Sequence, residues 1–158
     1  MAPEAPKAFE NDLKIIFQQF SNNNNYLSEE ITVGQWKDVL PSAEVKDAAP
    51  SRPITDITYE QARSFARNLT ERLHTNWPAH KEWSYRPFAR EEWFQAVDWS
   101  KIAGEVREIV SVTETSATTL GPEDKYDRGA ANAHKPKLPP DLPSGKDTRF
   151  RLVLEKTP

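Results

Sequence analysis

The chain has 158 residues, a length that suits one domain, and its lack of cysteine excludes disulfides, thiolate metal sites and thiol catalysis. The net charge of −3 gives no basic excess, so the composition does not support binding to a nucleic-acid backbone. Thirteen prolines against five glycines favour a loop-rich domain with short elements.

The N-terminal segment, residues 1–12, is rich in proline and alanine and is expected to form an extended arm, with residues 13–158 forming a single domain. It lacks the basic and apolar regions of a signal peptide, and no apolar run in the chain is long enough to span a membrane. The default expectation is a cytoplasmic protein. A periplasmic or secreted location stays open, because a signal can be removed.

Two patterns compete over residues 13–20. Apolar residues recur at helical spacing from Leu13 to Phe20, whereas Ile15 and Phe17 also fit a short strand, and the spacing leaves both open.

A short helix is predicted over 32–40, with Thr32 as its N-cap and Pro41 ending it. Its buried face is expected to hold Val33, Trp36, Val39 and Leu40.

The clearest element is a helix over 59–73. Thr58 and Gln61 have the spacing of a capping box, which marks its start. The apolar residues that recur on one face are Ala62, Phe65, Ala66, Leu69 and Leu73. A loop rich in aromatic residues is expected to follow over 74–88.

The second half of the chain is predicted to begin with one helix, which extended segments and a long loop follow. An amphipathic helix over 90–97 would bury Trp93, and residues 102–120 are rich in the β-favouring Val, Ile and Thr. Residues 121–148 are polar and proline-containing, as in a long surface loop, and the alternation over 150–154 predicts a final strand. The expected class is α+β with much irregular structure.

Five segments, in chain order, contain short motifs. They are EITVGQW at 30–36, PITDITYEQA at 53–62, YR at 85–86 with Glu92, Trp93 and Ala96, IAGEVREIVS at 102–111, and RG at 128–129 with FRLV at 150–153. Together they resemble motifs of the formylglycine-generating enzyme (sulfatase-modifying factor) family, such as E-V-T-x-G-Q-W/Y and M-A-G-N-V-W-E-W-V-S.

The resemblance implies a compact variant of the C-type-lectin-like fold, in which two helices accompany small twisted antiparallel sheets and long loops. It implies that the first and last strands lie near each other, and it favours the strand for 13–20. Gly34, Gly104 and Gly129 fall in the matching segments, where a positive φ or a close backbone approach is the expected reason for glycine.

The departures from the family pattern bear on function. The family's sulfatase-activating enzymes bind copper through a cysteine pair, which this chain lacks. Glu105 stands where family members have an Asn at a calcium site, and Arg107 and Ile109 replace two tryptophans. The losses fall where family members place metal and ligand, whereas core-type positions persist, which predicts a pseudoenzyme.

Calcium is the one cofactor that the sequence suggests. The carboxylates that would form a hard-cation site are Glu105, Glu108, Asp124 and Asp127. The alternative is a solvated acidic surface or a salt-bridge network, since Arg107 adds positive charge nearby.

Two groups of residues are candidates for a binding surface. The aromatic ones are Trp77, Trp83, Tyr85 and Trp99, which either line a carbohydrate or peptide groove or belong to the core. Pro139 and Pro140 lie in a proline-rich stretch, residues 135–143, which is either a polyproline-II docking segment or a rigid loop.

No catalytic residue is assigned. Glu91 and Glu92 point about 100° apart on the predicted helix, so they do not converge. His74 and His80 lack recognisable metal-ligand spacing and are expected to be exposed.

The main functional prediction is a non-catalytic interaction or structural module, an accessory subunit that binds protein partners in a larger complex. The alternatives are a calcium-dependent, lectin-like ligand-binding domain and a divergent enzyme of the family.

Overall fold

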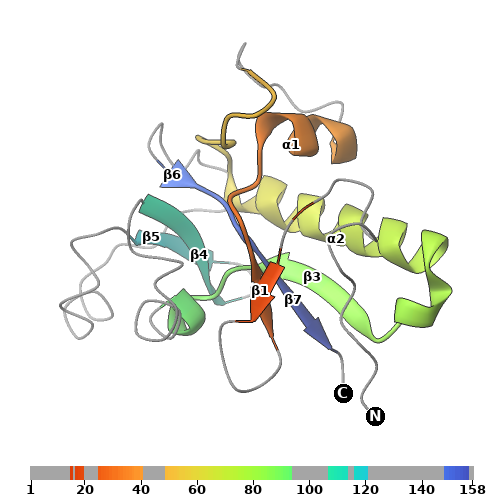
Figure 1. Cartoon of the computed structure of the whole chain (residues 1–158). Coiled ribbons are helices and arrows are strands. Elements are labelled where there is room, and N and C mark those ends of the chain that lie inside the picture. The colour runs from red at the N-terminus through yellow and green to blue at the C-terminus, as the bar shows by residue number, and fades with distance from the viewer. Residues whose placement is uncertain are drawn as a thin grey trace.

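The computed structural model describes residues 15, 17–19, 25–40, 49–93, 107–113, 116–120 and 148–156. They form an α+β arrangement of short helices and two small open sheets (Figure 1). The expected arm at 1–12 and most of the expected loop at 121–148 lie outside the described residues.

The first sheet has four antiparallel strands in the order β1-β2-β7-β3. The strands are β1 (Phe17–Gln19), β2 (Tyr26–Ser28), β7 (Leu152–Lys156) and β3 (Trp83–Pro87). The last described strand, β7, therefore lies between β2 and β3. Early and late segments thus share one sheet, as the resemblance implied.

The second sheet has three strands in the order β5-β4-β6. β4 (Arg107–Thr113) pairs antiparallel with β5 (Ser116–Leu120), and the register shifts between Ser111 and Thr113. The two-residue β6 (Thr148–Arg149) runs parallel to β4. The short segment from β6 to β7 therefore connects the two sheets.

Helices α1 and α2 each begin with a capping box. Helix α1 (Val33–Val39) is capped by Thr32, whose hydroxyl accepts the N–H of Gln35, while the Gln35 amide oxygen accepts the N–H of Thr32. Thr58 and Gln61 repeat this arrangement at the start of α2 (Tyr59–Asn76). Each box satisfies two backbone donors that no helical carbonyl reaches.

Helix α2 covers the outer edge of β3. The Thr70 hydroxyl accepts the N–H of Tyr85 at 2.9 Å, and the His74 ring Nε2 lies 2.7 Å from the carbonyl oxygen of Trp83. Because a carbonyl oxygen only accepts hydrogen bonds, Nε2 is assigned as the protonated ring nitrogen of His74. Backbone groups that an edge strand would leave unpaired are thus satisfied by side chains of the helix.

The predicted loop over 74–88 is wrong in most of its length. The helix continues to Asn76, the 3₁₀ helix η2 spans Pro78–His80, and β3 follows. Trp83 and Tyr85 are buried while Ser84 and Arg86 are half-buried. Large aromatic and polar residues thus alternate in the sequence, as they do in a strand with one face in the core. Two of the four aromatic side chains in this segment, Trp83 and Tyr85, are therefore buried by a strand and not by a loop.

The main core joins distant parts of the chain through three aromatic rings. Trp36 stacks on Phe65 with ring centroids 5.1 Å apart, and Phe150 meets both rings edge-on. Apolar residues are also buried outside this cluster: Leu27, Phe88, Trp93, Val110, Leu120 and Val153. Since neighbouring strand residues face opposite ways, β4 and β7 bury side chains on both faces.

Gly34 confirms the expected close approach of two backbones. A Cβ at this position would lie 3.1 Å from Cβ and 3.2 Å from the carbonyl oxygen of Pro50. The Gly34 N–H donates to that same oxygen at 2.9 Å. Gly104 and Gly129 lie outside the described residues.

Several other predictions can be compared with the structure. Part of 13–20 forms β1, which is the strand alternative. The extended segment 102–120 contains β4 and β5, and the final strand begins at 152 rather than 150. The predicted helix over 90–97 is helical at 90–93, and its remaining residues lie outside the described part.

Candidate functional site

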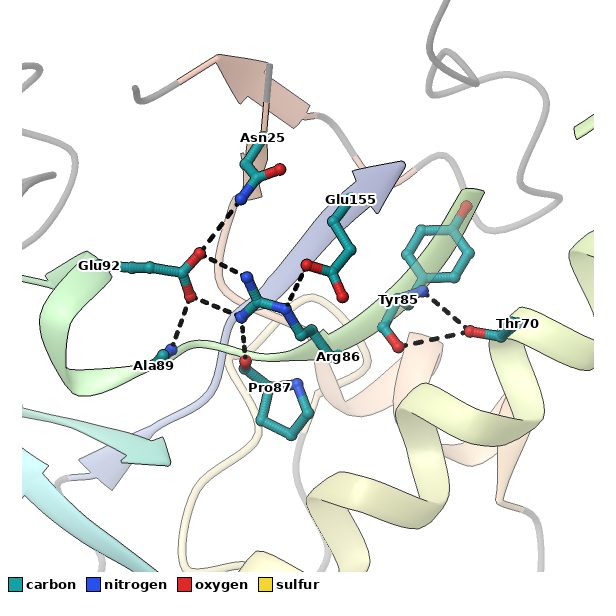
Figure 2. A network of polar contacts seen from close by, with 8 residues as sticks. All are labelled: Asn25, Thr70, Tyr85, Arg86, Pro87, Ala89, Glu92 and Glu155. Carbon is teal, nitrogen blue, oxygen red and sulfur yellow. Dashed lines mark hydrogen bonds and ion pairs between the residues drawn. The ribbon is translucent and has the colours of Figure 1, made fainter. Parts of the chain in front are cut away.

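Two networks of charged side chains are the most polar features inside the described part of the molecule. The first surrounds Arg86 on β3 (Figure 2). Its guanidinium forms a two-pronged contact with the Glu92 carboxylate, with both N–O distances at 2.5 Å. The Nε of Arg86 lies 2.8 Å from Glu155 on β7. Arg86 thus ties its own strand both to β7 and to the helical turn that comes after β3.

Glu92 also stabilises the helical turn in which it lies. Its carboxylate accepts the N–H of Ala89 at 3.1 Å, which stabilises the start of the helical turn at 90–93. The Asn25 side-chain amide donates to the same carboxylate at 3.4 Å (Figure 2). Burial alone would lower the pKa of Arg86, but hydrogen bonds and charges from Glu92 and then Glu155 raise it, so this arginine is always charged.

The second network is centred on Glu108 of β4, which is completely buried. The indole N–H of Trp93 donates to one carboxylate oxygen at 2.9 Å. The other oxygen lies 2.5 Å from Nε of Arg151, which is itself 8% exposed in its side chain. The Nε–H of Arg151 is not directed at this oxygen, so these two atoms form a close charge pair.

Glu30 extends this second network toward the surface. It contacts Arg149 at 2.6 Å and Arg151 at 3.7 Å, so two carboxylates and two guanidiniums alternate. Burial raises the pKa of Glu108 to about 7, with a smaller contribution from the charge of Glu30, while Arg151 and Trp93 oppose the rise. The removal of the carboxylate from water therefore outweighs its partners.

One short segment, residues 88–93, belongs to both networks. Glu92 contacts the first sheet through Arg86, and the adjacent Trp93 contacts the second sheet through Glu108. The carbonyl of Phe88 also accepts the N–H of Ser111 on β4 at 2.8 Å. This segment therefore fastens the two sheets together.

The candidate calcium ligands are only partly visible. Glu108 points into the protein, and both of its carboxylate oxygens contact other side chains, so in this arrangement it is not open to a calcium ion. Glu105, Asp124 and Asp127 lie outside the described residues. Within the described ranges, no group of three or more histidine, aspartate and glutamate side chains is placed to hold a metal. A calcium site stays a prediction.

The aromatic candidates differ in how deeply they are buried. Trp83 and Tyr85 are 3% and 4% exposed and belong to the main core, which is the core alternative for these two. Trp77 is half-buried at the end of α2. Trp99, Pro139 and Pro140 lie outside the described residues, and their assignment to a binding surface is untested.

Arg151 and Glu30 were not among the candidate residues. A signal exists for Arg151, because it stands between Phe150 and Leu152, and a similar signal exists for its partner Glu108, which precedes two apolar β-branched residues. A charge inside an apolar strand pattern indicates a buried pair, since an unpaired buried charge is very costly. Such a pattern does not identify the partner, which lies in a distant part of the chain.

None of the helices in the described part of the chain is long and apolar enough to cross a membrane. Comparisons with protein-family models, with curated proteins and with solved structures give no match to this chain. Fold and site together define an α+β protein whose buried charged residues, where described, are paired with other charged residues.

Proposed function

We propose that this chain is a non-catalytic interaction or structural module, an accessory subunit of a larger protein complex, on a compact C-type-lectin-like fold of the formylglycine-generating-enzyme type. The observation that carries the proposal is that charged residues of the motif segments form ion pairs within the protein. Charged side chains in the matching segments pair with charged residues of the same chain: Glu30, Arg86, Glu92, Glu108 and Arg151.

The fold supports the proposal at the level of architecture. The resemblance implies two helices with small sheets, and N- and C-terminal strands that lie near each other. Helices α1 and α2, two small sheets and the pairing of β2 with β7 agree with this layout. The matching segments thus preserve the residues that hold such a scaffold together.

The loss of catalysis rests on the sequence. A copper site of the family's kind needs two thiolates, and the chain has none. The carboxylates of Glu92 and Glu108 are each in contact with an arginine side chain. A scaffold retained without its catalytic ligands is suited to binding a protein partner.

The segments proposed to reach partners are the arm at 1–12 and the proline-rich stretch at 135–143. Proline restricts the unbound chain, which lowers the entropy lost on binding. The test is native mass spectrometry of the tagged protein purified from its source, for the wild type, P139A/P140A and the control P78A. Pro78 is an exposed proline in η2, so its replacement changes a surface proline outside the proposed segment.

The expected result is a stoichiometric complex for the wild type and P78A, and dissociation or a weaker complex for P139A/P140A. A strictly monomeric wild-type protein with no co-purifying chain would overturn the accessory-subunit proposal. An unchanged complex in P139A/P140A would remove the proline-rich stretch from the interface and leave the arm to be tested by deletion.

A further inference from the structure

The two edges of the first sheet differ in what covers them. At the β3 edge, the Thr70 hydroxyl accepts the N–H of Tyr85, and the His74 ring lies 2.7 Å from the carbonyl oxygen of Trp83, so α2 covers that strand. At the opposite edge, β1 pairs with β2. Among the described residues, the other side of β1 has neither a strand nor a backbone hydrogen bond. The backbone of β1 therefore presents donors and acceptors with which another extended chain can pair.

The sequence around β1 lacks the residues that commonly block such pairing. Proteins protect an edge strand with charged side chains, especially lysine, or with proline. The segment 15–20 reads Ile-Ile-Phe-Gln-Gln-Phe and contains no charged residue and no proline. The isoleucines and phenylalanines in it favour extended structure. The short length of β1, which is three residues, limits the hydrogen bonds to an added strand, so the expected association is weak.

The same sequence indicates that a second copy of the chain fits this edge. In an antiparallel pair of two copies, full overlap of β1 with itself places the two-fold axis at Gln18, the middle residue of the strand. Gln18 then faces Gln18 of the second copy. A charged residue at the axis would face an identical charge, which destabilises a sheet. Because β1 is uncharged, it is compatible with its own copy, and it offers no charge that would select a charged partner.

We propose that β1 is a homodimerisation edge, at which two copies of the chain pair through antiparallel β1 strands. This pairing joins the four-stranded sheets of the two copies into one continuous sheet. The interface is isologous, since both copies contribute the same residues. The inference is independent of the accessory-subunit proposal, because dimerisation is measured on the purified chain with no other protein present.

The test places a charge at the two-fold axis. Q18K and Q18E each set two like charges opposite each other, so we expect either variant alone to dimerise roughly fivefold more weakly than the wild type. An equimolar mixture of Q18K and Q18E places opposite charges at the axis and is expected to recover at least the wild-type affinity. The controls, T75K and T75E, introduce the same charges at an exposed position of α2 and should leave dimerisation unchanged.

Sedimentation velocity over a series of protein concentrations measures dimerisation in each sample. A second measurement uses the wild type alone, so its result does not depend on whether the Gln18 variants fold. It is NMR of a mixture of isotope-labelled and unlabelled chains, in which nuclear Overhauser contacts between the two copies are expected from residues 17–19.

A wild type that stays monomeric at its highest soluble concentration would overturn the proposal. A dimer whose affinity is the same for the wild type, for each Gln18 variant and for their mixture would also overturn it, because its interface would then lie elsewhere. The same conclusion would follow from contacts between copies that do not involve residues 17–19.

Discussion

The indole N–H of Trp93 donates a 2.9 Å hydrogen bond to Glu108, so a residue in the helical segment 90–93 binds one oxygen of a completely buried carboxylate on a strand 15 residues later. The Trp83 indole N–H is also buried, yet within the described residues it finds no hydrogen-bond acceptor. Two tryptophans of similar burial therefore differ in one hydrogen bond.

This difference predicts unequal costs for the same substitution. Phenylalanine in place of either tryptophan removes a similar volume, but Trp93→Phe also removes a bond to a charged acceptor, worth about 1.5–3 kcal/mol. We expect Trp93→Phe to lower the free energy of unfolding by about 2 kcal/mol more than Trp83→Phe. Urea unfolding of both variants checks this, and equal losses would contradict the assigned role of Trp93.

The raised pKa of Glu108 predicts a specific dependence of stability on pH. Its pKa is about 7 in the folded protein, against 4.5 for an unperturbed glutamate. The folded state binds this proton more tightly, so the contribution of Glu108 is fully present below pH 4.5 and is lost as pH rises through 7. The loss is on the order of 3 kcal/mol at most.

The measurement is urea unfolding of the wild type and Glu108→Gln at pH 5, 6, 7 and 8. The glutamine variant cannot titrate at this position, so the difference between the two curves isolates Glu108. We expect the wild type to lose stability relative to the variant between pH 5 and 7. Parallel curves would show that Glu108 does not titrate in this range.

Because α2 covers the edge of β3, replacement of Thr70 is expected to lower the free energy of unfolding. Thr70→Val keeps the shape but removes the hydroxyl that accepts the N–H of Tyr85, which leaves a backbone donor unsatisfied (Figure 2). We expect a loss of about 1–3 kcal/mol. Thr75→Val is the matched control, because Thr75 is exposed on the same helix. Thermal unfolding measures both, and similar melting temperatures for the two would argue against this edge contact.

Calcium is expected to leave the protein unchanged. The Glu108 carboxylate is held inside by Trp93 and Arg151, so it is not available to complete a site with Glu105, Asp124 and Asp127. We expect equal melting temperatures in calcium chloride and in EGTA. A calcium-dependent rise that disappears in Asp124→Asn/Asp127→Asn would establish a site and favour the lectin-like alternative over the accessory-subunit proposal.

Local sequence signals were sufficient to predict where α2 starts and which of its faces is buried. Thr58, Gln61 and the apolar stripe from Ala62 to Leu73 are near neighbours in sequence, so their pattern predicts both the start of α2 and its buried face. The helix extends beyond the predicted end at 73, because the Trp77 N–H continues the hydrogen bonding to Leu73. Helix ends depend on cap geometry and on neighbouring structure as well as on composition.

The strand β3 was missed although its alternation is present in the sequence. Trp83 and Tyr85 were assigned to a loop, since a five-residue run with large rings fits a loop or a strand equally well until its partner is known. Its partner β7 lies at the far end of the chain, and pairing over that separation leaves no local mark.

The amino-acid sequence by itself determined the absence of any thiol, the capping boxes, the amphipathic face of α2 and the α+β class, because each depends on composition or on spacing within a few turns. Only the tertiary structure decided that Arg151 meets Glu108, that Arg86 meets Glu92 and Glu155, and that Trp83 and Tyr85 are core. The physical reason is that a buried charge requires a partner without specifying which one, and the pairing of distant strands makes that choice.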